Sequence, residues 1–351
     1  MKKIKKAIVW MLVSAFALCL LTSCSGAEKR DYTLPSTVTV TRNDGRTVVF
    51  TFTYDGNKVT VKEDGELQSI EVCNDAGFPT EHQYYELGER RSTLTYQYDK
   101  EGRLIRQTHD DTTQESTVQT TVYDGEGREK EAILKTKNGD VLKKVVYEYG
   151  ENGSRTEKTY NGDGSLSYIG VYTFDGEGRM TEYAHFFRDE TVPSNRQTWE
   201  YDENGLPVRE CVYNSNGELD TQKAYAYDEQ GRETRMQRTY GDGTPSSRTE
   251  TVYSADGNYT VSTYYGEGVL SSRDTYGPDG KPLEERNYSD GEESEPIVIV
   301  YTYDGEGFLT RVEKSSEGAV WESREITETC TVSLTEEAYR FFMTMVERYA
   351  F

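Results

Sequence analysis

The stretch YQYDKEGRLIR, residues 96–106, decides the fold because close copies of it recur along the chain. Each copy places an aromatic residue before an Asp, a Gly three residues after that Asp, and in most cases an Arg next. Recurrence of one short pattern is the signature of a repeat architecture. The copies are TVYDGEGREKE from Thr121, YTFDGEGRMTE from Tyr172, AYDEQGRETR from Ala226, and the weaker WEYDENGLPV from Trp199 and YTYDGEGFLT from Tyr301.

The segments between these turns have the pattern of short antiparallel strands. From Tyr201 to Tyr303 the residue before each turn recurs every 11 to 15 residues, so two units give a period near 26. Aromatic residues alternate, as at Tyr96 and Tyr98, while Thr and charged residues fill the opposite face. This period of two predicts half-buried strands. The connections are too short for parallel crossovers, so the strands must be antiparallel.

Turn chemistry explains the spacing that recurs within the motif. Asp can accept hydrogen bonds from backbone N–H groups of the turn, and Gly supplies the positive φ that closes a type I turn with a bulge. Arg then falls beside Asp across the hairpin, where an exposed pair contributes about 0–1 kcal/mol and mainly fixes the register. The predicted structural turn residues are Asp99, Gly102, Arg103, Asp124, Gly127, Arg128, Asp175, Gly178, Arg179, Asp228, Gly231 and Arg232, with Gly307 in a weaker copy.

The predicted fold class is all-β with one C-terminal α-helix. About sixteen strands are too many for a flat open sheet, so we expect a repetitive β-hairpin meander in a coiled or solenoid-like sheet with its Tyr-rich face inward. After Cys330, the stretch SLTEEAYRFFMTMVERYAF carries a capping box at Ser333 and Glu336 and apolar residues at helical spacing. We expect this helix to cap the open end of the sheet. A partner-binding or membrane-surface helix is the alternative.

The N-terminus has the pattern of a secretory signal. Four lysines within residues 2–6 precede an apolar run, residues 7–21, which is too short to span a bilayer comfortably. The run ends in LTSC, which resembles a bacterial lipobox; the resemblance implies cleavage before Cys24 and a lipid on its sulfur. An ordinary signal peptide with a chance Cys is the alternative. The predicted domains are a signal peptide at 1–23, a tether at 24–36, a β-repeat domain at 37–330 and a capping helix at 331–351.

Composition indicates an acidic but folded chain. Without residues 1–23 it has 36 basic and 62 acidic residues, a net charge of −26. Such a charge repels nucleic acid and anionic headgroups, so no nucleic-acid partner is expected. Hydrophobic residues make up only 34% of the chain, yet there are 28 tyrosines. Disordered acidic chains are poor in aromatic residues, so this composition favours a folded protein with a thin, aromatic core.

The repeated aromatic-x-Tyr-Asp-x-x-Gly-Arg pattern resembles the YD repeat of RHS (rearrangement hotspot) proteins over roughly residues 45–312. Leu206 and Phe308 replace the Arg, and Cys73 replaces an aromatic residue. The intervening units YNGDGSL and YNSNGEL resemble the hairpin repeats of MORN-like antitoxin proteins. In large RHS toxins such repeats spiral into a shell around a toxic cargo. The resemblance implies the strand architecture here; it brings no cage, no toxin domain and no catalytic residue.

Other candidate chemistry is sparse. Cys73, Cys211 and Cys330 remain after processing and could form one disulfide with one free thiol, or three buried thiols. The three histidines lie far apart, and the acidic turns supply two or three oxygen ligands, fewer than a calcium loop needs. We therefore predict no enzyme, no metal and no cofactor, with calcium binding by the turns as a minor alternative.

These observations favour a lipid-anchored, extracytoplasmic scaffold that binds a protein or a glycan at the cell envelope. The candidate aromatic binding face is Tyr96, Trp199, Tyr225 and Tyr301. One alternative is a cell-wall glycan binder, although only Trp199 and Trp321 remain in the processed chain. The other is an enzyme or toxin-related factor, including an immunity lipoprotein. The expected partners are therefore the membrane, through the lipid anchor, and an unidentified protein or glycan.

Overall fold

The computed structural model describes residues 28–289, 291–305 and 308–350. In this part of the chain, 25 strands alternate with tight turns, and one α-helix, α1 (Glu336–Ala350), ends the sequence. The first strands are β1 (Arg30–Arg42), β2 (Thr47–Asp55), β3 (Lys58–Glu63), β4 (Glu66–Cys73), β5 (Pro79–Glu86), β6 (Glu89–Tyr98), β7 (Leu104–Asp111), β8 (Thr117–Tyr123), β9 (Glu129–Thr136) and β10 (Val141–Tyr149). A single 3-10 turn, η1 (Glu151–Gly153), follows β10.

The second half continues the same antiparallel meander. Its strands are β11 (Arg155–Asn161), β12 (Leu166–Phe174), β13 (Met180–Phe187), β14 (Asn195–Tyr201), β15 (Pro207–Tyr213), β16 (Leu219–Tyr227), β17 (Glu233–Tyr240), β18 (Pro245–Tyr253), β19 (Tyr259–Tyr265), β20 (Val269–Tyr276), β21 (Pro282–Ser289), β22 (Glu292–Glu293), β23 (Ile297–Tyr303), β24 (Leu309–Ser316) and β25 (Ala319–Leu334). β22 pairs only with β21, and the remaining 24 strands form one continuous sheet.

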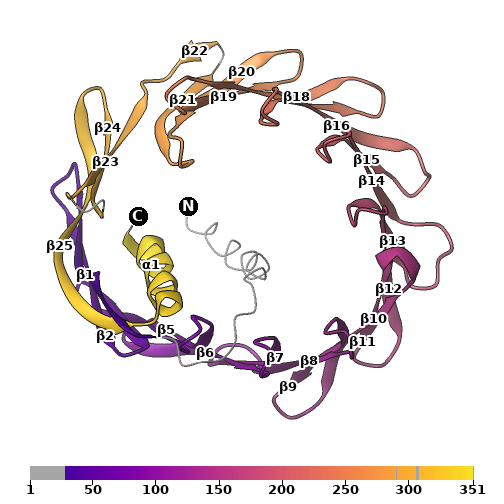
Figure 1. Cartoon of the computed structure of the whole chain (residues 1–351), viewed down its shortest axis with the longest axis horizontal. Helices are drawn as coiled ribbons and strands as arrows, with labels where there is room; N and C mark the ends of the chain where they lie inside the picture. Colours follow the sequence, from indigo (N-terminus) through magenta and orange to yellow (C-terminus); the bar gives the residue numbers. More distant parts are fainter. Residues whose placement is uncertain (1–27, 290, 306–307, 351) are drawn as a thin grey trace.

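The sheet closes on itself, so the expected open coil or solenoid-like sheet is wrong. β1 pairs with β2 on one side and with β25 on the other, which makes the molecule a closed antiparallel barrel with one C-terminal helix (Figure 1). The two closing strands are 13 and 16 residues long and pair at twelve positions, from Arg30↔Leu334 to Arg42↔Glu322. The repeat pattern shows that neighbouring strands pair, but it contains no signal that the first and last strands meet.

The closing strands also change the expected boundaries. β1 begins at Arg30, inside the stretch expected to be a tether, and Leu34 is fully buried. β25 runs past residue 330 to Leu334. The predicted signal peptide at 1–23, the lipobox and Cys24 lie outside the described residues. Residues 30–36, which were expected to belong to the tether, therefore form part of β1.

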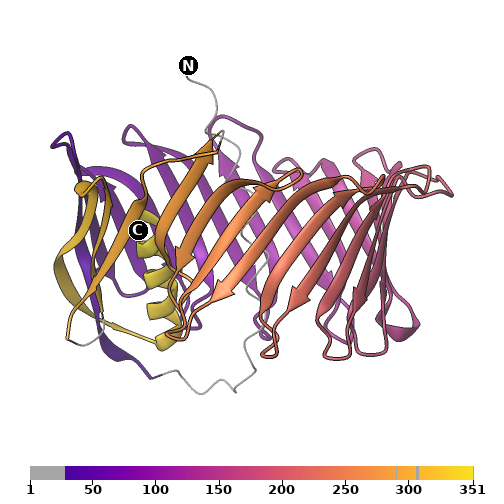
Figure 2. The same cartoon turned by 90° about the horizontal axis from the view of Figure 1, so that it is seen from above.

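Helix α1 begins two residues later than the capping box predicted. Ser333 lies in β25 opposite Asp31, and Thr335 takes the capping role because its Oγ1 accepts the N–H of Ala338 at 3.2 Å. The helix lies inside the barrel against the closing strands, and does not cover an open sheet end (Figures 1 and 2). In the described part of the chain, no helix is long and apolar enough to cross a membrane.

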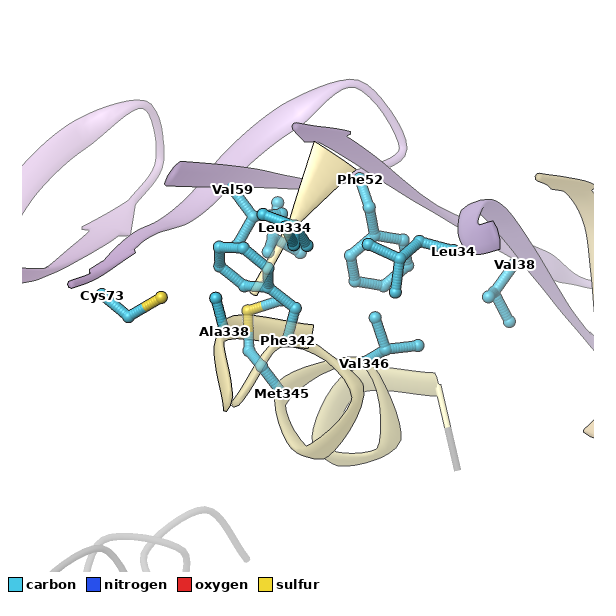
Figure 3. Close-up of a cluster of buried hydrophobic side chains, with 11 residues drawn as sticks. Leu34, Val38, Phe52, Val59, Cys73, Leu334, Ala338, Phe342, Met345 and Val346 are labelled. Carbon is cyan, nitrogen blue, oxygen red and sulfur yellow. The ribbon is translucent and has the colours of Figure 1, made fainter. Parts of the chain in front are cut away.

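The hydrophobic core is local and lies between α1 and the closure. Phe342 and Val346 are fully buried against Leu34, Phe52 and Val59 (Figure 3). A closed barrel of 24 strands encloses an interior too wide for side chains to fill. Over most of the ring the inward side chains are accordingly only half-buried. The protein thus has one packed segment and a long inner wall that faces solvent.

Candidate functional site

Helix α1 identifies which face of the sheet points into the barrel. Tyr54 contacts Phe342 of the helix edge-on with ring centroids 5.7 Å apart, so Tyr54 faces inward. Residues directly opposite each other in an antiparallel pair share a face, and alternate residues of a strand share it too. Following the register pairs around the ring returns to Ile326 opposite Val38, a member of the core beside α1. The same face of the sheet therefore points inward around the whole ring, and we call this inward face the inner wall.

All four aromatic residues of the predicted binding face lie on the inner wall and are half-buried. They stand on β6, β14, β16 and β23, however, and so are spread around the ring. The structure does not gather them into one pocket. Tyr96 lies near α1, whereas Trp199 and Tyr225 lie on the opposite side of the ring, two strands apart (Figure 1).

Trp199 and Tyr225 belong to one cluster, which we call the β14–β16 cluster: Trp199, Glu210, Lys223 and Tyr225. Glu210 stands opposite Trp199 on one side and opposite Lys223 on the other. Lys223 Nζ lies 3.0 Å from Glu210 Oε2, and the Tyr225 hydroxyl donates to the same oxygen at 3.2 Å. Burial, with the nearby Glu210 charge, raises the pKa of Tyr225 to about 12, so this phenol stays a hydrogen-bond donor at neutral pH.

A second cluster of the same chemistry, on β11–β13, was not predicted from the sequence. The Arg155 guanidinium lies 4.2 Å from the ring centroid of Tyr172, whose hydroxyl donates to Glu157 at 3.3 Å. Tyr183 packs on Tyr172 with centroids 4.8 Å apart. The two clusters share a Tyr that donates a hydrogen bond to a Glu on the neighbouring strand, with a cation close by. The corresponding sequence pattern is a Glu at an inward-facing position of one strand and a Tyr at an inward-facing position of the next. It can be recognised only when the register between the strands is known.

Both clusters place an aromatic ring beside hydrogen-bonding groups. In the β14–β16 cluster the carboxylate and the cation form an ion pair beside Tyr225, whereas in the β11–β13 cluster Arg155 stacks on Tyr172 and Glu157 accepts a hydrogen bond from that Tyr. Such a surface holds polar, uncharged ligands by stacking and hydrogen bonding. Two histidines of the inner wall are also paired, His82 Nδ1 with Glu71 at 2.6 Å and His109 Nε2 with Asp111 at 3.6 Å. Among the described residues, no group of three His, Cys, Asp or Glu side chains is placed to hold a metal ion.

The three cysteines of the described chain are free thiols and form no disulfide with one another. Cys73 belongs to the core beside α1, and burial raises the pKa of its thiol to about 12. Cys211 is buried and Cys330 is half-buried. Of the two alternatives left open by the sequence, the arrangement is closer to three separate thiols.

The predicted turn residues lie at one rim of the barrel, which we call the YD rim. Asp99 Oδ1 accepts the backbone N–H groups of Glu101 at 3.0 Å and Arg103 at 2.9 Å, and Arg103 Nε donates to Asp99 Oδ2 at 2.7 Å. The turns at Asp124, Asp175 and Asp228 repeat this geometry. The motif glycines adopt positive φ, as the turn chemistry predicts: Gly102 +80°, Gly127 +81°, Gly178 +79° and Gly231 +75°. Gly307 lies outside the described residues.

The motif Arg and Tyr have a further role that sequence reasoning missed. Each Arg stacks on the motif Tyr of a later hairpin, as Arg103 does on Tyr123 at 4.6 Å and Arg128 on Tyr149 at 4.3 Å. The hydroxyl of that Tyr donates to the carbonyl of the residue after the Arg, as Tyr123 does to Leu104 at 3.0 Å. We call this Tyr–carbonyl hydrogen bond a rim staple. The other rim staples are Tyr54 to Pro35, Tyr98 to Pro79, Tyr149 to Glu129, Tyr201 to Met180, Tyr227 to Pro207 and Tyr253 to Glu233.

The rim staples compensate for a gap in the strand ladder. Between β7 and β8 the register pairs extend only from His109↔Thr117 to Arg106↔Thr120, so the strands separate toward the YD rim. The Leu104 carbonyl lies in this gap, and the Tyr123 hydroxyl reaches across to it. The repeated motif is therefore a joint between successive hairpins as well as a turn.

Comparison with known proteins gives no family for this chain. No protein-family model matches it, and no curated protein matches it. Among solved structures, the crystal structure of TcdB2-TccC3 matches with 15% identity and a TM-score of 0.29, covering 84% of this chain and 19% of that one. A porin-like protein from Bacteroides uniformis matches with 10% identity and a TM-score of 0.24, covering 85% of this chain and 96% of that one. The chain thus spans about a fifth of the TcdB2-TccC3 chain.

Proposed function

We propose that this protein is a lipid-anchored, extracytoplasmic scaffold that binds an uncharged glycan on the inner wall of its barrel. The observation that carries the proposal is the β14–β16 cluster, where Trp199 and Tyr225 stand half-exposed beside the Glu210–Lys223 pair. The ring of Trp199 can stack on the apolar face of a sugar. Glu210 and Lys223 can accept and donate hydrogen bonds to its hydroxyl groups.

The charge of the inner wall favours a neutral ligand. The whole chain has a net charge of −22, yet the inward carboxylates of both clusters are partnered by a cation or a phenol. A ligand at the β14–β16 cluster therefore meets aromatic rings beside a carboxylate that is already paired with an ammonium group. A protein ligand is the other class of partner that the sequence suggests, and it becomes an outcome of the test below.

We propose binding and not catalysis because the polar side chains of the β14–β16 cluster already hydrogen-bond to one another. The Glu210 carboxylate already receives hydrogen bonds from Lys223 and Tyr225, which leaves it poorly placed as a general base. An inner wall built of repeated, similar clusters also suits a chain-like ligand with repeated units. A polysaccharide of the cell envelope has that chemistry.

The test is calorimetric titration of the processed protein, residues 24–351, with the uncharged oligosaccharides cellohexaose and chitohexaose. Tyr225→Ala removes an inner-wall ring, and we expect it to weaken binding by about two- to twelvefold, since an aromatic contact is worth about 0.5–1.5 kcal/mol. Tyr264→Ala is the matched control, because Tyr264 stands opposite Arg248 on the outer face.

Two results would contradict the proposal. Equal weakening by the two variants would show that the sugar does not distinguish the inner wall from the outer. Absence of binding to both oligosaccharides, with saturable binding of an envelope protein that Tyr225→Ala weakens, would replace the glycan with a protein ligand.

A further inference from the structure

One joint of the barrel, between β21 and β23, is built differently from the others. β21 and β23 are paired at only two positions, Glu284↔Val298 and Glu285↔Ile297. The corresponding joints β7–β8 and β13–β14 are each paired at four positions. Toward the other rim, β21 turns to β22 instead of to β23. The β21–β23 seam is thus held by a shorter ladder than comparable seams.

The seam also lacks the rim staple. At the regular joints the motif Tyr donates to a carbonyl 19 to 21 positions earlier, which here would join Tyr303 to Pro282. Instead, the Tyr303 hydroxyl accepts a hydrogen bond from Lys281 Nζ at 2.8 Å, and Lys281 is also held by Asp279 at 3.1 Å. Within the described residues, no hydrogen bond joins Tyr303 to the Pro282 carbonyl.

A groove occupies this seam, with a volume of about 520 Å³. Its apolar lining includes Leu283 on β21, and Ile299, Val300 and Tyr301 on β23, while Asp279, Lys281 and Tyr303 line it toward the YD rim. Val300 keeps 48% of its surface exposed, although it is a β-branched apolar residue in a strand. The groove therefore combines apolar side chains with strand edges whose register pairing has stopped.

We propose that the β21–β23 seam is a strand-insertion site for an extended polypeptide segment. Backbone N–H and C=O groups on a strand edge are recognised by another backbone in the β conformation, which adds main-chain hydrogen bonds while its alternate side chains enter apolar pockets. A sugar or lipid cannot make that ladder. The acidic chain, with a net charge of −22, attracts a segment that carries lysine or arginine. This site is separate from the glycan-binding clusters on β11–β16.

An inserted strand requires β21 and β23 to stand two strand spacings apart, about 9.6 Å. A disulfide between paired residues holds their Cα atoms within about 7 Å. When oxidised, the variant Glu284→Cys/Val298→Cys therefore has a disulfide across one of the two β21–β23 pairs, which keeps the two strands adjacent. Reduction breaks this disulfide and allows the strands to separate. The matched control is Glu182→Cys/Thr198→Cys, a directly opposed pair at the regular β13–β14 joint.

The probe is a fluorescent ten-residue peptide of alternating threonine and valine with a lysine at each end, and binding is followed by anisotropy. We expect saturable binding to the processed protein and to the oxidised control. The oxidised seam variant should bind about tenfold or more weakly, and reduction should restore its affinity. The same peptide N-methylated at alternate residues cannot donate to a strand edge and should not bind.

Three results would overturn the strand-insertion proposal. They are no saturable binding of the peptide, equal binding of the N-methylated peptide, and equal binding by the oxidised and reduced seam variant. Cellohexaose titrations of the same variant distinguish the two sites, because the β14–β16 cluster lies elsewhere on the ring and its glycan binding should not respond to oxidation.

Discussion

At the residue scale, the YD motif performs two tasks with the same few side chains. Asp and Gly set the turn: Asp124 Oδ1 receives the N–H groups of Glu126 and Arg128, and Gly127 takes a positive φ. Arg and Tyr then link that turn to another hairpin, through a stacked guanidinium and a hydroxyl–carbonyl hydrogen bond. This double role explains why the motif is repeated as a set, since the turn needs Asp and Gly and the joint needs Arg and Tyr.

Gly127→Val should lower the free energy of unfolding by about 1–3 kcal/mol, because a β-branched side chain is strained at positive φ. The φ of Gly127 is +81°, and a Cβ there would also lie 3.1 Å from the guanidinium of Arg103. Urea denaturation followed by tyrosine fluorescence measures the change. Gly125→Val, in the same turn, is the control: it is a glycine outside the positive-φ set with open space around its Cβ position. Equal losses in the two variants would contradict the conformational argument.

The rim staple gives a second prediction at this scale. Tyr149→Phe removes only the hydroxyl that donates to the Glu129 carbonyl at 2.9 Å and leaves the ring under Arg128 in place. We expect a loss of about 1 kcal/mol in the free energy of unfolding, the usual net value of one hydrogen bond. Hydrogen exchange should rise at the β9–β10 joint near the YD rim. Tyr160→Phe on the outer face should change neither quantity, and an equal effect there would refute the staple.

At the scale of single elements, the sequence was informative about strands and turns and less so about how they are joined. Period-two alternation and Asp-x-x-Gly spacing predict each hairpin, because both are local. The predicted cap of α1 is wrong because Ser333, with Glu336 three residues later, completes a capping box that Thr335, with Ala338 at that place, does not. Only the pairing of Ser333 with Asp31 in β25 shows that the helix begins after Thr335. The inner-wall clusters could be predicted in part. The alternation of side chains along each strand predicts that Trp199 and Tyr225 face inward, whereas identifying their partners Glu210 and Lys223 requires the register between strands.

Helix α1 is the element whose removal should matter most for closure. Phe342 is fully buried between Tyr54 and the core residues of the closing strands. Phe342→Ala should lower the free energy of unfolding by about 3–5 kcal/mol, the cost of a large cavity in a packed core. Hydrogen exchange should increase along β1 and β25 before it does on β14–β18. Thr344→Ala on the exposed side of the helix is the control, and uniform exchange around the ring would contradict a local role for α1.

At the scale of the whole molecule, the proposed anchor places the barrel at a membrane surface. Replacing Cys24 with Ser should release the protein from the membrane fraction or leave it as an uncleaved precursor, because a thioether-linked lipid needs the Cys sulfur. Fractionation of the expressing cells, together with fatty-acid labelling, measures both outcomes. Cys211→Ser is the control, since that thiol is buried in the barrel. Normal lipid labelling of the Cys24 variant would contradict the lipobox interpretation.

Closure is the feature of the whole molecule that the sequence could not supply, because it depends on two strands separated by almost the entire chain. In a coiled open sheet β1 and β25 would lie at opposite ends, whereas in the closed barrel Thr39 stands directly opposite Glu325. Directly opposed residues of antiparallel strands have Cα atoms about 4.5–5.5 Å apart, which is within reach of a disulfide. Thr39→Cys/Glu325→Cys should therefore oxidise to a single large loop that migrates faster than its reduced form in a non-reducing gel. Thr39→Cys/Glu250→Cys places the second thiol on β18, far around the ring, and should stay reduced (Figure 1). If the first pair failed to cross-link under oxidant while the folded state persisted, the barrel would be open in solution, and the inner wall would be one face of a sheet exposed to any ligand.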